Sequence, residues 1–329
     1  MRKQDSLLVV LTVACVALFA ACTPTPVTTT ITTTVAPVDC EARGPNVNLS
    51  GCDLRGARLA YANLTGANLT GANLTRAILV DATLISANLT GANLTRATLY
   101  GANLTRAKLT DAILVDANLI SANLYGANLT DANLYGADLR SANLTDAELP
   151  GADLRNANLT GADLYGADLT RANLANANLT DATLTDATLA NANLYGANLG
   201  NADLRNASLI YAYLDFANLA GADLQGADLQ GADLFKAELF FADLRGANLT
   251  AADLSAANLF ADLRGANLTR AKLIESNLSY ALLTDANLTD ADLTDAILTN
   301  ANLYGAIWSN TTCPNGVVQS TECPRTAAG

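Results

Sequence analysis

The sequence contains no histidine, one tryptophan and only 5% aromatic residues among its 329 positions. The lack of histidine excludes the Ser-His-Asp and Cys-His relays and removes imidazole as a metal ligand. Basic residues are also scarce, because 19 Lys and Arg stand against 31 Asp and Glu and leave a formal charge of −12. A chain of this charge repels a phosphate backbone. We therefore expect no nucleic-acid partner, no metal, no cofactor and no catalytic residues.

The N-terminal segment has the composition of an export signal. Arg2 and Lys3 precede an apolar run from Leu7 to Ala21, which is 15 residues long. This length is short for a membrane-spanning helix and typical of the apolar part of a signal peptide. The sequence therefore predicts a signal peptide at residues 1–21, and a transmembrane anchor is the alternative.

The residues that end this run resemble the lipobox of bacterial lipoproteins, in which small residues precede a cysteine. The resemblance implies that Cys22 is lipidated and becomes the mature N-terminus. Phe19 departs from the usual leucine, so ordinary cleavage with release of the protein stays open. Residues 22–39 are rich in Thr and Pro, a composition typical of an extended tether.

A period of five residues dominates the rest of the chain. Leucine occupies every fifth position from Leu49 to Leu259 and again from Leu263 to Leu303. Alanine stands two residues before almost every one of these leucines, and the residue between them is most often Asn or Asp. This period matches neither the helical 3.6 nor the strand period of 2. A turn must therefore occur every five residues if Leu and Ala are to face one core.

These A(D/N)LXX repeats resemble the pentapeptide-repeat family over residues 47–308. The resemblance implies an all-β fold, a right-handed quadrilateral β-helix with four repeats in each coil. The 52 leucines then correspond to about 13 coils, and at ~4.8 Å per coil the rod is about 60 Å long. A solenoid of this kind needs a cap at each end. Trp308 takes the position of the next leucine and is the expected plug of one end.

Four cysteines remain after the N-terminal segment, and they allow three pairings. If the repeats between them form a rod, only sequence-local pairs meet the ~4.4–6.8 Å Cα spacing of a disulfide. We therefore expect Cys40 to pair with Cys52 and Cys313 with Cys323. The first pair belongs to a cap loop at residues 40–52, and the second to a cap and tail at residues 309–329. A zinc site is the rival interpretation, although two cysteines at each end without histidine are a poor ligand set.

One residue is missing from the repeat near its C-terminal end. The string ADLRGANLT begins at Ala242 and again at Ala261, an offset of 19 rather than 20. The missing position lies between Leu259 and Leu263. We expect the chain to tighten or kink near Phe260 and Ala261 while each face keeps its register.

In this register four aspartates stack on one face, and a mainly basic row stacks beside them. The aspartates are Asp203, Asp223, Asp243 and Asp262, and the second row is Arg205, Gln225, Arg245 and Arg264. Carboxylates ~4.8 Å apart repel each other, and the arginines can neutralise them. A weak cation site is the alternative, but a straight row lacks the surrounding oxygens that calcium prefers.

Acidic and aromatic residues concentrate in the same half of the repeat. Residues 151–303 hold 19 acids and 8 bases, whereas residues 53–150 hold 8 acids and 7 bases. All five phenylalanines beyond the signal segment lie in the acidic half, and Phe240 and Phe260 are expected to stack one coil apart. Exposed aromatic patches mark partner sites, although aromatic ladders also stabilise β-stacks. Phe240 and Phe260, together with the charged rows, form the candidate interaction face.

Three functions are compatible with the sequence. The preferred hypothesis is an exported, lipid-anchored or released periplasmic or extracellular rod that is monomeric, has no catalytic activity and binds an unknown protein or envelope component. The family resemblance implies a second, an acidic rod that mimics DNA and inhibits DNA gyrase. A third is a β-helix enzyme that acts on polysaccharide through a carboxylate pair, for which Asp243 is the test residue.

Overall fold

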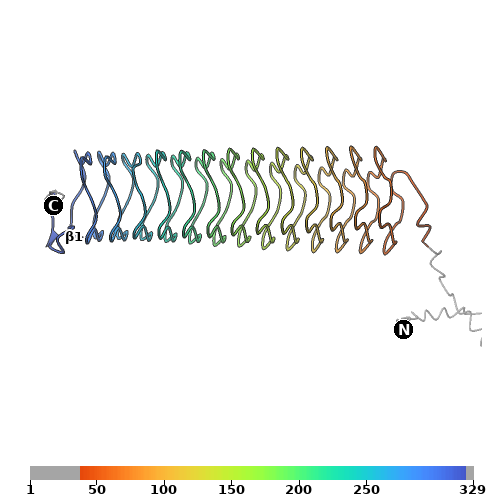
Figure 1. The fold of residues 1–329 in the computed structure, drawn as a ribbon, viewed down its shortest axis with the longest axis horizontal. Helices are drawn as coiled ribbons and strands as arrows, with labels where there is room; N and C mark the ends of the chain where they lie inside the picture. Colours follow the sequence, from red (N-terminus) through yellow and green to blue (C-terminus); the bar gives the residue numbers. More distant parts are fainter. Residues whose placement is uncertain (1–37, 324–329) are drawn as a thin grey trace, which may run out of the picture. The chain divides into compact units, whose positions relative to one another are not determined.

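The computed structural model describes residues 38–323 of the chain. Residues 39–323 wind into a stack of evenly sized coils (Figure 1). No residue between 38 and 323 is helical, so this range holds no helix that could cross a membrane. The predicted signal peptide, Cys22 and nearly all of the tether lie outside the described residues.

Successive coils pair in parallel through single bridges. The bridges join residues 20 apart, beginning with Asn48 and Asn68, except where the missing residue shortens the step to 19. In each bridge the backbone groups on both sides of one residue bond to the next coil. For example, the Leu159 N–H donates to the Asn178 carbonyl at 2.7 Å, and the Asn178 N–H donates to the Ala157 carbonyl at 2.9 Å. Each five-residue side therefore contributes one very short strand, which confirms the all-β prediction.

The core is a column of leucine and alanine. From Leu64 to Leu259 the repeat leucines and alanines are at most 1% exposed. The two residues lie on the same side of the extended segment because they are two positions apart. Burial of a leucine side chain contributes about 1.5–3 kcal/mol relative to its exposure. The core thus extends along the whole stack without a break between coils.

Two residues after each leucine form the corner. At one such corner the Ala162 N–H donates to the Leu159 carbonyl at 2.9 Å, and Gly161 between them has φ of 63°. This is the arrangement of a type II turn, which requires a positive φ at its third residue. Asp181 and Asn201 occupy the same position of later corners with φ of 57° and 54°, which agrees with the tolerance of Asp and Asn for this region.

The polar residue before each leucine holds the corner in place. The Asn68 Oδ1 accepts bonds from the Thr70 backbone N–H at 3.2 Å and the Thr70 Oγ1 at 2.7 Å. Aspartate does the same at Asp168, which accepts from Thr170. These Asx turns satisfy a backbone donor that the parallel pairing leaves free. They explain why Asn and Asp, rather than any polar residue, recur at this position.

Disulfide loops lie at both ends of the stack. Cys40 pairs with Cys52 at a Cα separation of 5.5 Å, and Cys313 pairs with Cys323 at 5.4 Å. The second loop contains the short antiparallel strands β1 (Thr311–Thr312) and β2 (Val318–Gln319). Trp308 stands in the leucine register and is 9% exposed.

The missing residue converts one corner into a tighter turn. The Ala261 N–H donates to the Leu259 carbonyl at 2.7 Å, across two residues instead of three, as in a γ-turn. Asp243 still bridges to Asp262, and Asn258 to Asn277, so the faces keep their register as predicted. Within residues 38–323, however, the Phe260 N–H has no acceptor and the Ser279 carbonyl has no donor. We call this turn the shortened corner.

The inward and outward sides of a strand predict stability losses of different size for neighbouring substitutions. Leu114 is fully buried, whereas Ile113 beside it is 39% exposed and contributes its backbone to the ladder. We expect Leu114→Ala to reduce the free energy of unfolding by about 2–5 kcal/mol, and Ile113→Ala by less than about 1 kcal/mol. Equilibrium denaturation of both variants checks this, and equal losses would contradict the assignment of the core.

A glycine inserted between Phe260 and Ala261 should complete the shortened corner. The added residue supplies a donor for the Ser279 carbonyl, and a typical hydrogen bond contributes about 0.5–1.5 kcal/mol. We expect a melting temperature no lower than that of the wild type. The matched control is a glycine inserted between Thr160 and Gly161, where the corner is already complete and an added residue disrupts it. Equal destabilisation by both insertions, measured by calorimetry, would contradict the interpretation that the shortened corner lacks one residue of a complete turn.

Candidate interaction face

The four predicted aspartates form a continuous row. Parallel bridges join Asp203 to Asp223, Asp223 to Asp243, and Asp243 to Asp262. Thr183 precedes the row and Leu282 follows it. The side chains point outward because each aspartate lies between an inward alanine and an inward leucine. The shortened corner therefore leaves this row unbroken.

Arginines two residues further on neutralise most of the row. Arg205 Nε lies 2.8 Å from Asp203 Oδ1, and Arg245 and Arg264 make the same contact with Asp243 and Asp262. Two of the arginines also approach the next coil, since Arg205 lies 3.7 Å from Asp223 and Arg245 lies 3.9 Å from Asp262. Gln225 interrupts the basic row and donates only its backbone N–H to Asp223.

The pKa values of these carboxyls follow from the pairing. Hydrogen bonds from Arg205, Arg245 and Arg264 hold the pKa of Asp203, Asp243 and Asp262 below the ordinary value. These three carboxyls are consequently ionised and compensated by their own arginines at neutral pH. Among residues 38–323 no group of His, Cys, Asp and Glu is arranged to hold a metal ion. The observed pairing favours charge compensation over a cation site.

The pKa of one carboxyl outside the row, Asp215, is shifted in the opposite direction. Burial raises the pKa of Asp215, and the neighbouring Asp233 carboxylate raises it further. No arginine or lysine bridges Asp215 within the described part of the chain, whereas Lys272 lies 3.1 Å from Asp253 nearby. Asp215 is therefore a destabilising charge when it ionises in the folded protein.

Aromatic rings form a ridge over the shortened corner. The ring centroid of Phe260 lies 4.9 Å from that of Phe241 and 5.7 Å from that of Tyr280, in edge-on orientations. The prediction that Phe260 stacks on Phe240 is wrong in its partner, because the shortened corner directs the Phe260 ring to Phe241 and Tyr280. Phe240 instead shares the wall of an adjacent hollow with Phe260. We call Phe241, Phe260 and Tyr280 the aromatic ridge.

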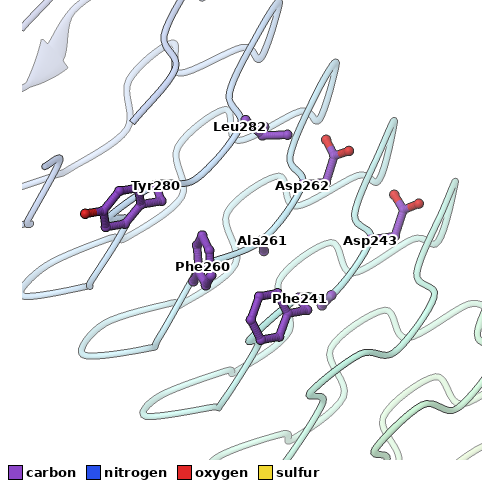
Figure 2. A pocket seen from close by; sticks show the side chains of 8 residues that line it. Phe241, Asp243, Phe260, Ala261, Asp262, Tyr280 and Leu282 are labelled. Atoms are coloured by element: carbon purple, nitrogen blue, oxygen red, sulfur yellow. The ribbon is translucent and has the colours of Figure 1, made fainter. Parts of the chain in front are cut away.

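A shallow hollow lies on each side of the aromatic ridge. The first has a volume of about 450 Å³ and places the three rings on one side and Asp243, Asp262 and Leu282 on the other (Figure 2). Ala261 forms its floor and is 6% exposed, more than the other repeat alanines nearby. The second hollow, of about 360 Å³, is lined by Phe240, Asn258, Asn277 and Ser279 together with Phe260 and Tyr280 of the ridge. Phe260, which begins the shortened corner, and Tyr280 line both hollows.

A second aromatic cluster lies on the preceding corner of the coils. Phe216 contacts Tyr195 at 5.5 Å and Phe235 at 5.8 Å between ring centroids. Lys236 lies over Phe216 and Phe235 at 5.7 and 5.1 Å, within the range of a cation–π contact. The rings of this second cluster therefore already contact a cation from the same chain, the Lys236 ammonium.

The sequence interpretation missed Phe241 and Tyr280. The signal was present, because Phe241 and Phe260 differ by 19 residues and Tyr280 follows Phe260 by 20. These are the offsets of neighbouring coils across the missing residue. Only the turn geometry decides that Phe260 turns toward Phe241 instead of Phe240.

The repeat that builds this face has known relatives. A sequence model described as Pentapeptide repeats matches residues 46–312 in overlapping segments. The chain belongs to the pentapeptide-repeat family. Membership agrees with the β-helix implied by the A(D/N)LXX pattern. No curated protein matches the chain significantly.

Solved pentapeptide-repeat structures resemble the chain. HetL from the cyanobacterium Nostoc sp. strain PCC 7120, involved in heterocyst differentiation regulation, is 34% identical over 70% of this chain and 92% of its own, with a TM-score of 0.45. A protein of the Arabidopsis thaliana thylakoid lumen is 32% identical over 38% of this chain and 69% of its own, with a TM-score of 0.21. QnrB1, a plasmid-mediated fluoroquinolone resistance protein, is 19% identical over 73% of this chain and 88% of its own, with a TM-score of 0.28.

The opposite pKa shifts predict opposite effects of pH. The raised pKa of Asp215 means that its ionisation destabilises the fold as pH rises from its ordinary value of 3.8. Asp215→Asn should therefore raise the melting temperature at pH 7 and have little effect at pH 3. Asp243 has a lowered pKa, so its contribution is present at pH 7 and is lost as pH falls below about 3.8. Asp243→Asn should lower the melting temperature at pH 7 only, and thermal scans at both pH values that show the same sign for both variants would contradict the assignment.

Proposed function

We propose that the protein is an exported, lipid-anchored rod of the cell envelope that binds a partner through its surface and carries out no catalysis. The pairing of the four cysteines between residues 38 and 323 carries this proposal. Disulfides persist in exported proteins and are rare in reducing compartments. The order of the segments agrees with it, because a stretch with the composition of a signal peptide, the predicted lipidation site Cys22 and a Thr/Pro-rich segment precede the repeats.

The rod in this proposal has about 13 coils and is closed at both ends. The loops tied by Cys40–Cys52 and Cys313–Cys323 act as caps, and Trp308 fills the last leucine position. Caps prevent one sheet edge from pairing with another. The protein is therefore a monomer whose long faces, rather than its ends, are available to a partner.

The geometry of the carboxylates favours binding over catalysis. Glycoside hydrolysis needs two carboxyl groups that face each other across a substrate and differ in pKa. Asp243 and Asp262 lie side by side in one row, each is paired with an arginine, and the pKa of both carboxyls is lowered. A polysaccharide hydrolase is for this reason less favoured than a binding protein.

The same pairing also disfavours mimicry of DNA. A mimic must present rows of uncompensated negative charge in place of phosphates. Here Arg205, Arg245 and Arg264 cover three of the four aspartates of the row. Export would in addition separate the rod from a cytosolic DNA gyrase.

Removal of the lipidation site should release the protein. We expect full-length wild-type protein in the membrane fraction of expressing cells and Cys22→Ala in the soluble fraction. The matched control is Cys15→Ala, which lies within the signal peptide and should leave the distribution unchanged. Mass spectrometry of the mature N-terminus should show a lipid-modified Cys22, and a Cys22→Ala protein that stays in the membrane would contradict the anchor.

A further inference from the structure

We propose that the aromatic ridge and its two hollows bind an extended, neutral polysaccharide of β-1,4-linked hexopyranoses. This inference rests on the proposed function, because it names the chemistry of the partner that the rod binds. It starts from the shortened corner, where one residue is missing from the five-residue period. The departure exposes backbone groups, apolar rings and space at one place.

The shortened corner supplies free hydrogen-bonding groups. At intact corners where Asn or Asp precedes the leucine, the N–H after leucine bonds to that side chain, as when Ser279 donates to Asn277 at 3.1 Å. Within residues 38–323 the Phe260 N–H makes no such bond, and the Ser279 carbonyl accepts none. Unpaired backbone groups retain the hydrogen-bonding capacity that folding normally uses. Hydroxyl groups of a sugar can both donate and accept, so they match this donor and acceptor together.

The ridge supplies apolar surface at the spacing of the coils. Phe241 and Tyr280 are 74% and 57% exposed, so both rings present apolar surface to solvent. Together with Phe260 they place one ring on each of three successive coils. Sugar rings present an apolar C–H face to aromatic side chains. Each sugar of an extended β-1,4-linked chain advances the chain by nearly the spacing of one coil, so successive sugars would lie over successive coils of the ridge.

The charges at the hollows favour a neutral ligand. Asp243 and Asp262 line the first hollow, but Arg245 and Arg264 pair with them at 2.8 Å. Asn258, Asn277 and Ser279 line the second hollow and are uncharged. A cationic or anionic partner would have to break these ion pairs or find no counter-charge. Neutral hydroxyl groups can bond to the outer oxygens of the paired carboxylates without breaking the pairs.

The same features disfavour a peptide that adds a strand. Strand addition requires a row of unpaired N–H and C=O groups along a sheet edge. The shortened corner offers one donor and one acceptor, and they lie at a turn instead of along an edge. Both hollows are also open and shallow, unlike the pockets that receive anchor side chains.

Calorimetric titration of the purified protein with cellohexaose tests the proposal. We expect saturable binding by the wild type and at least tenfold weaker binding of maltohexaose, whose α-linkages curve the chain away from the ridge. Absence of saturable binding of cellohexaose, or equal binding of the two sugars, would overturn the proposal. Competition for cellohexaose by unrelated extended peptides would instead assign the ridge to a protein partner and would also overturn it.

Two kinds of variant locate the site. A glycine inserted between Phe260 and Ala261 fills the shortened corner and should weaken cellohexaose binding at least tenfold without lowering the melting temperature. Tyr280→Ala should do the same, whereas Tyr304→Ala is the matched control, because Tyr304 is 80% exposed but lies outside the ridge. Unchanged binding by both the insertion and Tyr280→Ala would place the sugar elsewhere and refute the site.

Failure of this inference is distinguishable from failure of the proposed function. Cell fractionation of Cys22→Ala does not depend on sugar binding, and titration of the purified protein does not depend on the anchor. A protein that is anchored but binds no cellohexaose refutes only the sugar site. A protein that binds cellohexaose but is not anchored refutes only the lipid tether.

Discussion

The structure depends on the return of Leu and Ala to one axis every five residues. At the intact corners this return depends on a third residue with positive φ, as at Gly161 and Asp181, and the shortened corner achieves it by a tighter turn. The corners leave backbone groups that no single coil can satisfy, and the neighbouring coils accept and donate the missing bonds. Core and hydrogen bonding therefore constrain each other. Neither exists without a stack of coils.

Most of this architecture follows from the sequence because the repeat is strict. The leucines from Leu49 to Leu303 determine the period, and the 19-residue offset between Ala242 and Ala261 locates the interruption. The row from Asp203 to Asp262 follows by counting alone. Periodicity assigns residues to faces, and it does so without any knowledge of side-chain conformations.

The partner of the Phe260 ring was not predictable in this way. Counting in steps of 20 places Phe240 next to Phe260, whereas the γ-turn at Ala261 brings Phe260 against Phe241 and Tyr280. The raised pKa of Asp215 likewise depends on burial and on Asp233, a residue on a neighbouring coil in a different position of the repeat. Local geometry decides both features, and a one-dimensional pattern contains no information about it.

The disulfide loops and the shortened corner bear on how neighbouring coils separate. In a stack whose coils touch only their neighbours, unfolding ordinarily begins by fraying at a terminus. Disulfides hold the chain at Cys40–Cys52 and Cys313–Cys323, so fraying there is opposed. The shortened corner, where the Ser279 carbonyl lacks its inter-coil hydrogen bond, is then the place inside the stack at which we expect neighbouring coils to separate first. Separation of the coils at this corner would expose leucines that are otherwise fully buried, Leu259 and Leu278 among them.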